Sequence, residues 1–304
     1  MSDSRIYPNI DGLARLSQLG KTLAWHPPYQ RLTPLTGKHR SLQRGRGLDF
    51  VELRHYYPGD DVRCIDWKVT QRTGQAYLRV YAEENDKQIA LLIDLRNTMF
   101  FASDGSMKSA IASEVAAIIS GGIIGDGDRL GAVVLTAQGI ITIPCRRGEK
   151  ALLSILNTLV QEAGKLPSLE PKSVSLADGL ETLNNLGLRN SQCFIISDFH
   201  DYASSHASRY LDALAQHNSL IGFSINDPLE EKLPTHDVLF GNQELQVEIK
   251  KHQLTDKAQF EEHVAEEKRQ LKAHFDKHRL ALLNFTTHQE TWAQMQLHCK
   301  GENQ

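Results

Sequence analysis

Gln88-Ile89-Ala90-Leu91-Leu92-Ile93-Asp94 is the stretch that decides the fold class of this chain. A continuous apolar run that ends in a carboxylate is typical of a central parallel strand, buried on both faces. The pattern recurs at Cys193-Phe194-Ile195-Ile196-Ser197-Asp198. Segments with helical patterning, such as Lys108 to Ile124, separate these runs. Strands that alternate with helices predict a doubly wound, mostly parallel α/β sheet.

Further elements follow from the same patterns. We expect strands at Arg129–Leu135, Ile140–Ile143, Leu220–Ile225 and Leu280–Phe285, and helices at Lys150–Leu159, Leu176–Leu186, Tyr210–Ala215, Thr255–His278 and Thr291–Leu297. A hairpin is expected from Val238–Phe240 and Leu245–Ile249. In the charged helix Thr255–His278 the apolar positions share one face, which should pack inward: Phe260, Val264, Leu271 and Phe275.

The region before the first buried run differs in character. Apolar residues at helical spacing between Ile10 and Leu23 predict one amphipathic helix, and a basic, polar loop from Leu32 to Arg46 follows it. That loop is either a solvated segment or a contact for an acidic partner or phosphate. The alternating stretches Leu48–Arg54 and Ala76–Tyr81 predict two strands. We therefore divide the chain into residues 1–46, a β-rich subdomain at 47–86, and the α/β domain at 87–304.

Composition excludes several classes of protein. The 304 residues are 40% hydrophobic and carry a formal net charge of -3, so the chain is neither disordered nor drawn as a whole to nucleic acid. Its four cysteines are far apart, which indicates neither a disulfide framework nor a zinc ribbon. The longest uncharged apolar stretch, about Val115 to Gly125, falls short of the roughly 18–20 residues that span a bilayer. With no apolar leader at the start, we expect a cytoplasmic, non-membrane-spanning protein.

Asp94 and Asp198 end two of the buried strands and should lie on the same rim of the sheet, where ligands bind in such folds. Two converging carboxylates could hold Mg²⁺, with hydroxyl oxygens from Thr98 and Ser197 as further ligands. Alternatively, each carboxylate caps a helix or accepts from turn amides.

Patterns for nucleotide binding and nucleophilic catalysis are absent from the sequence: there is neither a phosphate-binding loop of the G-x-x-x-x-G-K-[ST] type nor a G-x-S-x-G elbow. We expect no metal site of the H-E-x-x-H or H-x-x-x-H type on any helix. The most suggestive histidine is His200, in Asp198-Phe199-His200-Asp201. Together with Asp94, this group leaves open a metal-assisted hydrolase.

The most specific stretch runs from Gly47 to Lys68, GLDFVELRHYYPGDDVRCIDWK. Its Phe-x-x-x-Arg-x-Tyr lead, followed by Pro-Gly-Asp-x-x-Arg-x-Ile-Asp-Trp, resembles the signature of the domain of unknown function 58 family. The resemblance continues at Asp94-Leu95-Arg96-Asn97-Thr98-Met99, Gly127–Gly131 and Asn226–Glu230, so it covers most of the chain.

This family is similar to von Willebrand factor A domains and is often encoded beside MoxR-type AAA+ ATPases. The resemblance therefore implies a von Willebrand factor A-like, Rossmann-like domain without settled enzymatic activity. It further implies an adaptor or co-chaperone that assembles or activates other proteins, with a MoxR-type ATPase and other von Willebrand factor A proteins as partners. No cofactor is expected apart from Mg²⁺ as an alternative.

Type A domains hold a metal through Asp-x-Ser-x-Ser, a later Thr and a last Asp. By resemblance, Asp94 and Asp198 match the two aspartates and Thr98 the second Ser, while Val174 falls where the Thr belongs. Arg96 stands in place of the first Ser. A guanidinium is always charged and accepts no hydrogen bond, so it repels a cation. We expect a degenerate site in which Arg96 pairs with Asp94 or Asp198 and takes the place of the cation.

The signature has two possible roles. It can form an internal network, in which Pro58-Gly59 makes a turn, aspartates accept from amides, Arg63 pairs with a carboxylate and Trp67 anchors the β-rich unit. Alternatively, it forms a partner-binding surface. The residues concerned are Arg54, Tyr56, Pro58, Gly59, Asp60, Asp61, Arg63, Asp66 and Trp67. Three functions thus remain: a non-catalytic interaction module, which we favour, metal-dependent ligand binding at Asp94 and Asp198, and the hydrolase.

Overall fold

The computed structural model describes residues 3–23, 48–83, 87–168, 170–231, 238–241, 246–249 and 254–300. The chain forms two compact units. The main unit comprises residues 1–31 and 87–304, and the signature unit comprises residues 32–86. The basic cluster predicted between residues 38 and 46 lies outside the described residues.

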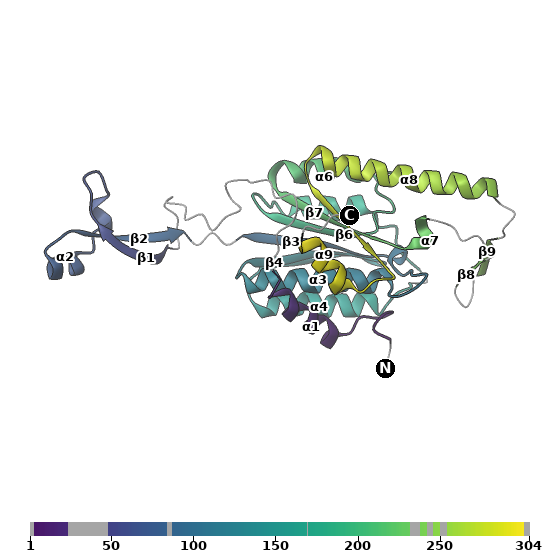
Figure 1. Cartoon of the computed structure of the whole chain (residues 1–304), viewed down its shortest axis with the longest axis horizontal. Helices are drawn as coiled ribbons and strands as arrows, with labels where there is room; N and C mark the ends of the chain where they lie inside the picture. The colour runs from purple at the N-terminus through teal and green to yellow at the C-terminus, as the bar shows by residue number, and fades with distance from the viewer. Residues whose placement is uncertain are drawn as a thin grey trace. The chain divides into compact units, whose positions relative to one another are not determined.

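A six-stranded sheet forms the centre of the main unit (Figure 1), in the order β10-β7-β6-β3-β4-β5. All neighbours are parallel except β4 and β5. The strands are β3 (Gln88–Leu95), β4 (Arg129–Thr136), β5 (Gly139–Arg146), β6 (Gln192–Ser197), β7 (Ser219–Asn226) and β10 (Ala281–Thr286). The predicted mixed α/β, mostly parallel sheet is therefore confirmed, and it is compatible with a Rossmann-like fold.

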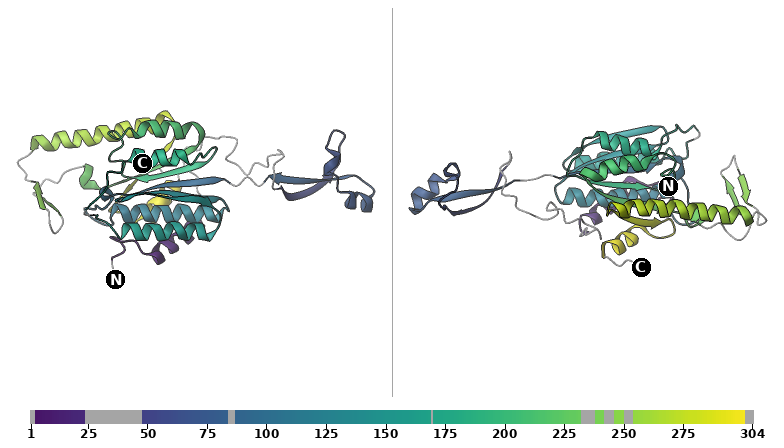
Figure 2. Two further views of the ribbon diagram at one scale, coloured as in Figure 1. Left: turned by 180° about the vertical axis from the view of Figure 1, so that it is seen from behind. Right: turned by 90° about the horizontal axis from the view of Figure 1, so that it is seen from above.

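Helices cover both faces of this sheet, as Figures 1 and 2 show. One layer contains α1 (Ile10–Gly20), α3 (Lys108–Gly125), α4 (Glu149–Ala163) and α9 (Thr291–Lys300). The opposite layer contains α5 (Leu176–Asn185), α6 (Ala207–His217) and α8 (Leu254–Lys277). Alternate residues of β3 serve the two cores: Leu91 and Ile93 pack in the first, Ala90 and Leu92 in the second. A strand that is apolar on both faces needs both layers, which explains its unbroken hydrophobic run.

Helix α1 belongs to the main unit, whereas the predicted division places it with the loop up to residue 46. It packs on α3, and glycines allow the two helices to approach closely. A Cβ at Gly121 would lie 1.8 Å from the Ser17 carbonyl oxygen, and one at Gly20 would lie 2.0 Å from the carbonyl oxygen of Ile118. The structure thus separates residues 1–31 from the signature unit.

Helix α3 is also long and apolar enough to cross a membrane by composition, and is the one such helix among the described residues. However, 78% of that stretch is buried inside the fold. Burial of this kind is what the central helix of a two-layered α/β core requires.

The chain reverses its winding direction between β3 and β6. From β3 it proceeds to β4 and β5 on one side, then returns to β6, β7 and β10 on the other. The carboxyl ends of β3 and β6 therefore flank the topological switch point, where ligands bind in open α/β sheets. Asp94 is the last residue but one of β3, and Asp198 directly follows β6.

Helix α8 matches the prediction in extent but only partly in packing. Leu271 and Phe275 are buried, whereas Phe260 is 40% exposed. The inward packing predicted for Phe260 is wrong, because the first part of α8 extends beyond the end of the sheet (Figures 1 and 2). The short helix α7 (Pro228–Glu231) and the antiparallel hairpin of β8 (Val238–Gly241) and β9 (Gln246–Ile249) precede α8.

The signature unit consists of an antiparallel pair, β1 (Leu48–His55) and β2 (Tyr77–Glu83). The strands were predicted, but the connection between them contains a short 3-10 helix, η1 (Val62–Cys64), and a helix, α2 (Trp67–Thr73), that were not. The α2 helix begins at Asp66, whose carboxylate accepts from the amides of Lys68 and Val69, and ends at Gly74 with φ +73°. An Asp cap and a left-handed glycine are standard start and stop signals.

Candidate functional site

A buried guanidinium occupies the carboxyl end of β3. Arg96 Nε lies 2.9 Å from Asp94 Oδ1 and Arg96 Nη2 lies 2.7 Å from Asp94 Oδ2, a two-pronged pair that the Arg96 backbone amide reinforces at 3.0 Å. The Asp94 side chain is 0% exposed and that of Arg96 is 10% exposed. The expected pairing of Arg96 with Asp94 is confirmed.

The same guanidinium also binds a second carboxylate, that of Asp201, in the loop that follows the neighbouring strand β6. Arg96 Nη1 and Nη2 lie 2.8 and 2.9 Å from the two Asp201 oxygens. Asp201 also accepts from the amide of Leu176, at the start of α5, and Arg96 Nη1 donates to the Val174 carbonyl oxygen at 3.1 Å. Arg96 therefore ties the end of β3 to the loop after β6 and to the start of α5. Val174, which lacks a side-chain oxygen, contributes its backbone oxygen instead.

Ser197 completes the surroundings of Asp94. Its hydroxyl donates to Asp94 Oδ2 at 2.7 Å and accepts from the Phe199 amide at 3.0 Å. Each oxygen of Asp94 thus has protein partners, and the hydroxyl that could have served a metal is committed to the same network.

A second buried cation, Lys108, holds Asp198. Lys108 is the first residue of α3, its side chain is 1% exposed, and Nζ lies 2.9 Å from Asp198 Oδ2. The same ammonium pairs with Glu230, which follows β7 on α7. The other Asp198 oxygen accepts from the His200 amide at 3.1 Å. Lys108 therefore does for the end of β6 what Arg96 does for the end of β3.

Burial and charge act in opposite directions on these groups. Burial raises the pKa of Asp198, but Lys108 and the His200 amide outweigh it, so the pKa lies below its usual value. Burial lowers the pKa of Lys108, and Asp198 and Glu230 raise it further than burial lowers it. In the same way, burial lowers the pKa of Arg96, but Asp94 and Asp201 raise it by more, so this pKa lies above its usual value. All these groups remain charged at neutral pH, as paired buried ions must.

The residues at this rim do not fit a bound Mg²⁺. Both oxygens of Asp94 are committed to Arg96 and Ser197, and both oxygens of Asp198 to Lys108 and an amide. A divalent ion would also lie beside two buried cations. Thr98, the remaining hydroxyl, is exposed on the 3-10 turn η2 (Asn97–Met99). The side chains that a metal-assisted hydrolase would use do not form one catalytic group either. His200 is exposed to solvent, and Asp201 is paired with Arg96.

In the signature unit, part of the predicted internal network is present. Arg54 forms a two-pronged pair with Asp60, both distances being 2.7 Å, and Asp60 also accepts from the Tyr57 amide at 2.9 Å. These contacts close the Pro58-Gly59 turn, in which Gly59 has φ +108°. Tyr56 joins the ladder through its backbone amide. Asp61 caps η1 by accepting from the Arg63 amide.

One expectation for the signature is wrong. The partner of Asp66 is Arg79, with Nε 2.8 Å from Oδ2, whereas the exposed Arg63 side chain pairs with no carboxylate in the described part of the chain. The anchoring of the β-rich unit by Trp67 stays a prediction, and the Trp67 side chain is 68% exposed. An open hollow of about 380 Å³ adjoins it, lined by Arg63, Cys64, Ile65, Asp66, Trp67, Lys68 and Arg79. Exposed Tyr57 and Val62 lie in the same turn-rich connection.

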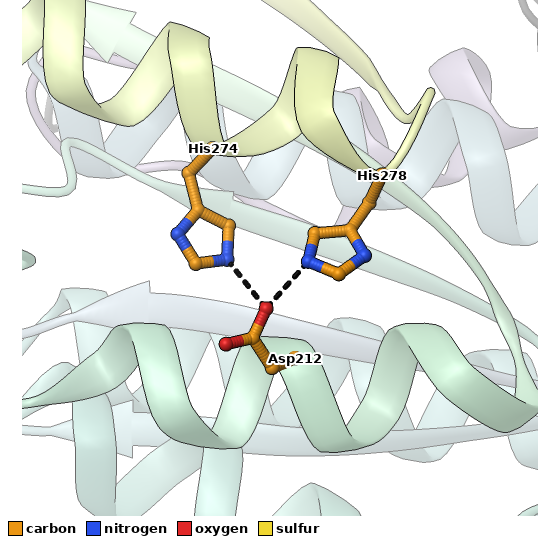
Figure 3. A group of neighbouring side chains, drawn as sticks. All are labelled: Asp212, His274 and His278. Atoms are coloured by element: carbon orange, nitrogen blue, oxygen red, sulfur yellow. Dashed lines mark hydrogen bonds and ion pairs between the residues drawn. The ribbon is translucent and has the colours of Figure 1, made fainter.

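Sequence reasoning missed three groups. The sequence pattern indicates Lys108 only as the start of a helix, and it places Asp201 in a possible hydrolase group rather than with Arg96. The expectation that no helix carries an H-x-x-x-H metal spacing is also wrong: His274, on α8, and His278, directly after it, have this spacing and lie beside Asp212 of α6 (Figure 3). The i,i+4 spacing of the two histidines was visible in the sequence. Asp212 was not, because it lies 62 residues before His274.

A family profile described as "Protein of unknown function DUF58" matches residues 52–270. The chain belongs to this family. The resemblance seen in the signature is thereby confirmed, and the matched region includes the signature from Glu52 onward and the rim of ion pairs.

Curated relatives within the family carry no described activity. The uncharacterized proteins Mb1516 of Mycobacterium bovis and Rv1480 of Mycobacterium tuberculosis are each 30% identical to this chain over 202 residues, or 66% of it. The matched region spans 62% of the length of these relatives.

Solved structures give weaker matches. BatB from Bacteroides thetaiotaomicron is 11% identical, with a TM-score of 0.39 over 70% of this chain and 95% of its own. An aerotolerance-related membrane protein from Bacteroides fragilis is 12% identical, with a TM-score of 0.40 over 71% and 98%.

Proposed function

We propose that this DUF58 protein is a non-catalytic interaction module, an adaptor or co-chaperone that works with a MoxR-type AAA+ ATPase. The main unit is inferred to be a von Willebrand factor A-type domain whose metal position is degenerate. The family resemblance suggests the partner. The observation that carries the proposal is the exposed aromatic and apolar surface of the signature unit.

Three apolar side chains of the signature unit expose more than half of their surface: Trp67 at 68%, Tyr57 at 64% and Val62 at 56%. Exposed large apolar residues mark interaction sites, and Trp and Tyr dominate binding energies when a partner buries them. Of the three, Trp67 lines the hollow. Arg63 and Lys68 line the same hollow. The surface therefore suits a partner that brings an apolar group with acidic neighbours.

The rim of the main unit supports the same proposal. Arg96 and Lys108 neutralise the carboxylates at the switch point from within the protein. Carboxylates that are already neutralised by buried ion pairs fit a structural role at this rim. They fit metal-dependent ligand binding or hydrolysis less well. The four free cysteines also agree with the proposed location, a reducing cytoplasm.

The experiment is a binding titration of the full chain against the MoxR-type ATPase encoded nearest to its gene, with ATP, with ADP and without nucleotide. We expect a complex in at least one nucleotide state. Trp67→Ser should weaken it by at least about tenfold, because a buried tryptophan anchor is typically worth 2 kcal/mol or more.

Leu153→Ser is the matched control, since Leu153 is 46% exposed on α4 of the main unit. It should leave the affinity unchanged. Absence of a complex in all nucleotide states would refute the ATPase partnership. Equal effects of the two substitutions would refute the signature unit as the docking surface.

A further inference from the structure

Asp212, His274 and His278 form a compact cluster where α6 and α8 pack together, on the face of the sheet opposite α3 (Figures 1 and 3). The Nε2 atoms of His274 and His278 lie 3.1 and 2.5 Å from the same oxygen, Asp212 Oδ1. His274 lies in the last turn of α8 and His278 directly follows the helix, and both imidazoles face Asp212 of α6 side by side (Figure 3). Their rings stack with centroids 5.3 Å apart.

We propose that this cluster is a binding site for a divalent transition-metal ion of the zinc type, which fastens the end of α8 to α6. Two imidazole nitrogens and one carboxylate are a donor set that suits Zn²⁺, Cu²⁺ or Ni²⁺ and is poor for Mg²⁺ or Ca²⁺, which prefer oxygen. The donors come from two elements, so the ion would link parts of the fold that are distant in sequence.

The spacing of the donor atoms suits such an ion. The three atoms lie within 4.8 Å of one another. Two ligands bound at about 2.0–2.1 Å to a tetrahedral ion are themselves about 3.4 Å apart. Small side-chain shifts would therefore open the present hydrogen-bonded arrangement into a coordination sphere. Three protein ligands leave a fourth position for water or for a ligand from outside.

Access also favours the site. Lys277 Nζ, 3.9 Å from Asp212, is the nearby competing cation, but its side chain is 67% exposed and can turn into solvent. The ligands themselves are 14–38% exposed, which leaves an entry path.

A tyrosine beside the cluster provides a second, independent observation. Tyr202 packs edge-on against His274, with centroids 5.8 Å apart. Its hydroxyl is buried and has no hydrogen-bond partner among the described residues. An unpaired buried hydroxyl is costly, and a water on the metal's fourth position could supply a partner.

The test is calorimetric titration of Zn²⁺ alone into the tag-free, chelator-stripped full chain, in competition with a chelator of known affinity. The chain has 13 histidines, so a control on the same helix is needed. His263→Ala provides it: His263 is 73% exposed on α8 and forms an i,i+4 pair with Glu267, but it is not part of the cluster. We compare the wild type, His263→Ala, His274→Ala and His278→Ala.

We expect the wild type and His263→Ala to bind one equivalent of Zn²⁺ with the same affinity. The affinity of His274→Ala and His278→Ala for Zn²⁺ should fall at least about tenfold, because even the loss of a residue that only hydrogen-bonds a metal ligand has an effect of this size. Zn²⁺ should also raise the midpoint of thermal unfolding of the first pair and not of the second. Equal affinity in all four proteins, or no binding to the wild type, would overturn the site.

Asp212→Asn covers the case in which a histidine variant fails to fold, because it keeps the shape and an acceptor oxygen while removing the charge. It too should lose at least about tenfold in affinity for Zn²⁺. Co²⁺ provides a spectroscopic check: a tetrahedral visible spectrum is expected in the wild type and not in Asp212→Asn. The spectrum of the octahedral aqueous ion in the wild type would contradict the proposal.

Discussion

Basic side chains surround carboxylates in two regions of the main unit: the rim at the ends of β3 and β6, and the cluster between α6 and α8. The two regions differ in which basic side chains they use. At the rim, Arg96 and Lys108 are permanently charged and nearly fully buried. In the cluster, His274 and His278 partner a carboxylate that is 38% exposed. A fixed cation excludes a metal, whereas a neutral imidazole can bind one. The difference indicates that the rim is structural and that the cluster is the better candidate for a ligand.

The largest effect is expected from Arg96→Met. This substitution leaves Asp94, 0% exposed, and Asp201 without their guanidinium. Removing one partner of a buried ion pair costs about 3–5 kcal/mol, because the remaining charge is buried and uncompensated. Urea unfolding at neutral pH measures the loss. Arg15→Met, on the exposed side of α1, is the control and should stay within about 0.5 kcal/mol of the wild type. A loss below about 1 kcal/mol for Arg96→Met would mean that the rim is not locked in this way.

Lys108→Met should have a somewhat smaller effect, about 3 kcal/mol, because one of its two partners, Glu230, is 37% exposed and can be hydrated. The double variant Lys108→Met/Asp198→Asn removes the stranded charge as well. We expect it to recover stability relative to the single variant, with a coupling energy of about 1–3 kcal/mol in a double-mutant cycle. Additive effects would contradict direct pairing of the two residues.

Acid sensitivity should be smaller still. The pKa of Asp198 is lower in the folded chain than its usual value of 3.8, so the unfolded chain takes up this proton first as the pH falls. The stability that Asp198 contributes is therefore complete above about pH 4 and is lost as the pH falls toward the folded pKa. Unfolding curves from pH 7 to pH 3 should show the wild type losing stability faster than Lys108→Met/Asp198→Asn below about pH 4. Parallel pH profiles would contradict this account.

The contrast also explains which parts were predictable. The buried runs that end in Asp94 and Asp198 define the sheet, because a two-sided core needs an unbroken apolar strand. The pairing of Arg96 with Asp94 or Asp198 was predicted from the resemblance to the type A metal motif, in which Arg96 stands where a metal-binding Ser belongs, and the structure selects Asp94. In contrast, the contacts of Asp201 with Arg96 and of Asp212 with the two histidines join elements distant along the chain. No local pattern reports such contacts.

Local signals were also overlooked. The α2 helix had an Asp cap at Asp66 and a glycine stop at Gly74, but its seven residues carry too little periodicity to stand out. Lys108 begins an otherwise apolar helix, where a lysine is usually solvated. Its burial becomes intelligible once the fold brings Asp198 and Glu230 to the same place.

The smallest effect on stability is expected from Asp212→Asn, in the cluster between α6 and α8. Without metal, Asp212→Asn should cost less than about 1 kcal/mol in the free energy of unfolding, since partly exposed pairs contribute little and the amide oxygen can still accept from an imidazole. The corresponding change at the rim, Asp94→Asn, removes a fully buried partner of Arg96 and should cost several times more. With Zn²⁺ added, the gap between wild type and Asp212→Asn should widen, because the ion stabilises the protein that binds it, while the effect of Asp94→Asn should not change. If Zn²⁺ instead altered the cost of Asp94→Asn, the assignment of the rim as structural and the cluster as the metal site would have to be reversed.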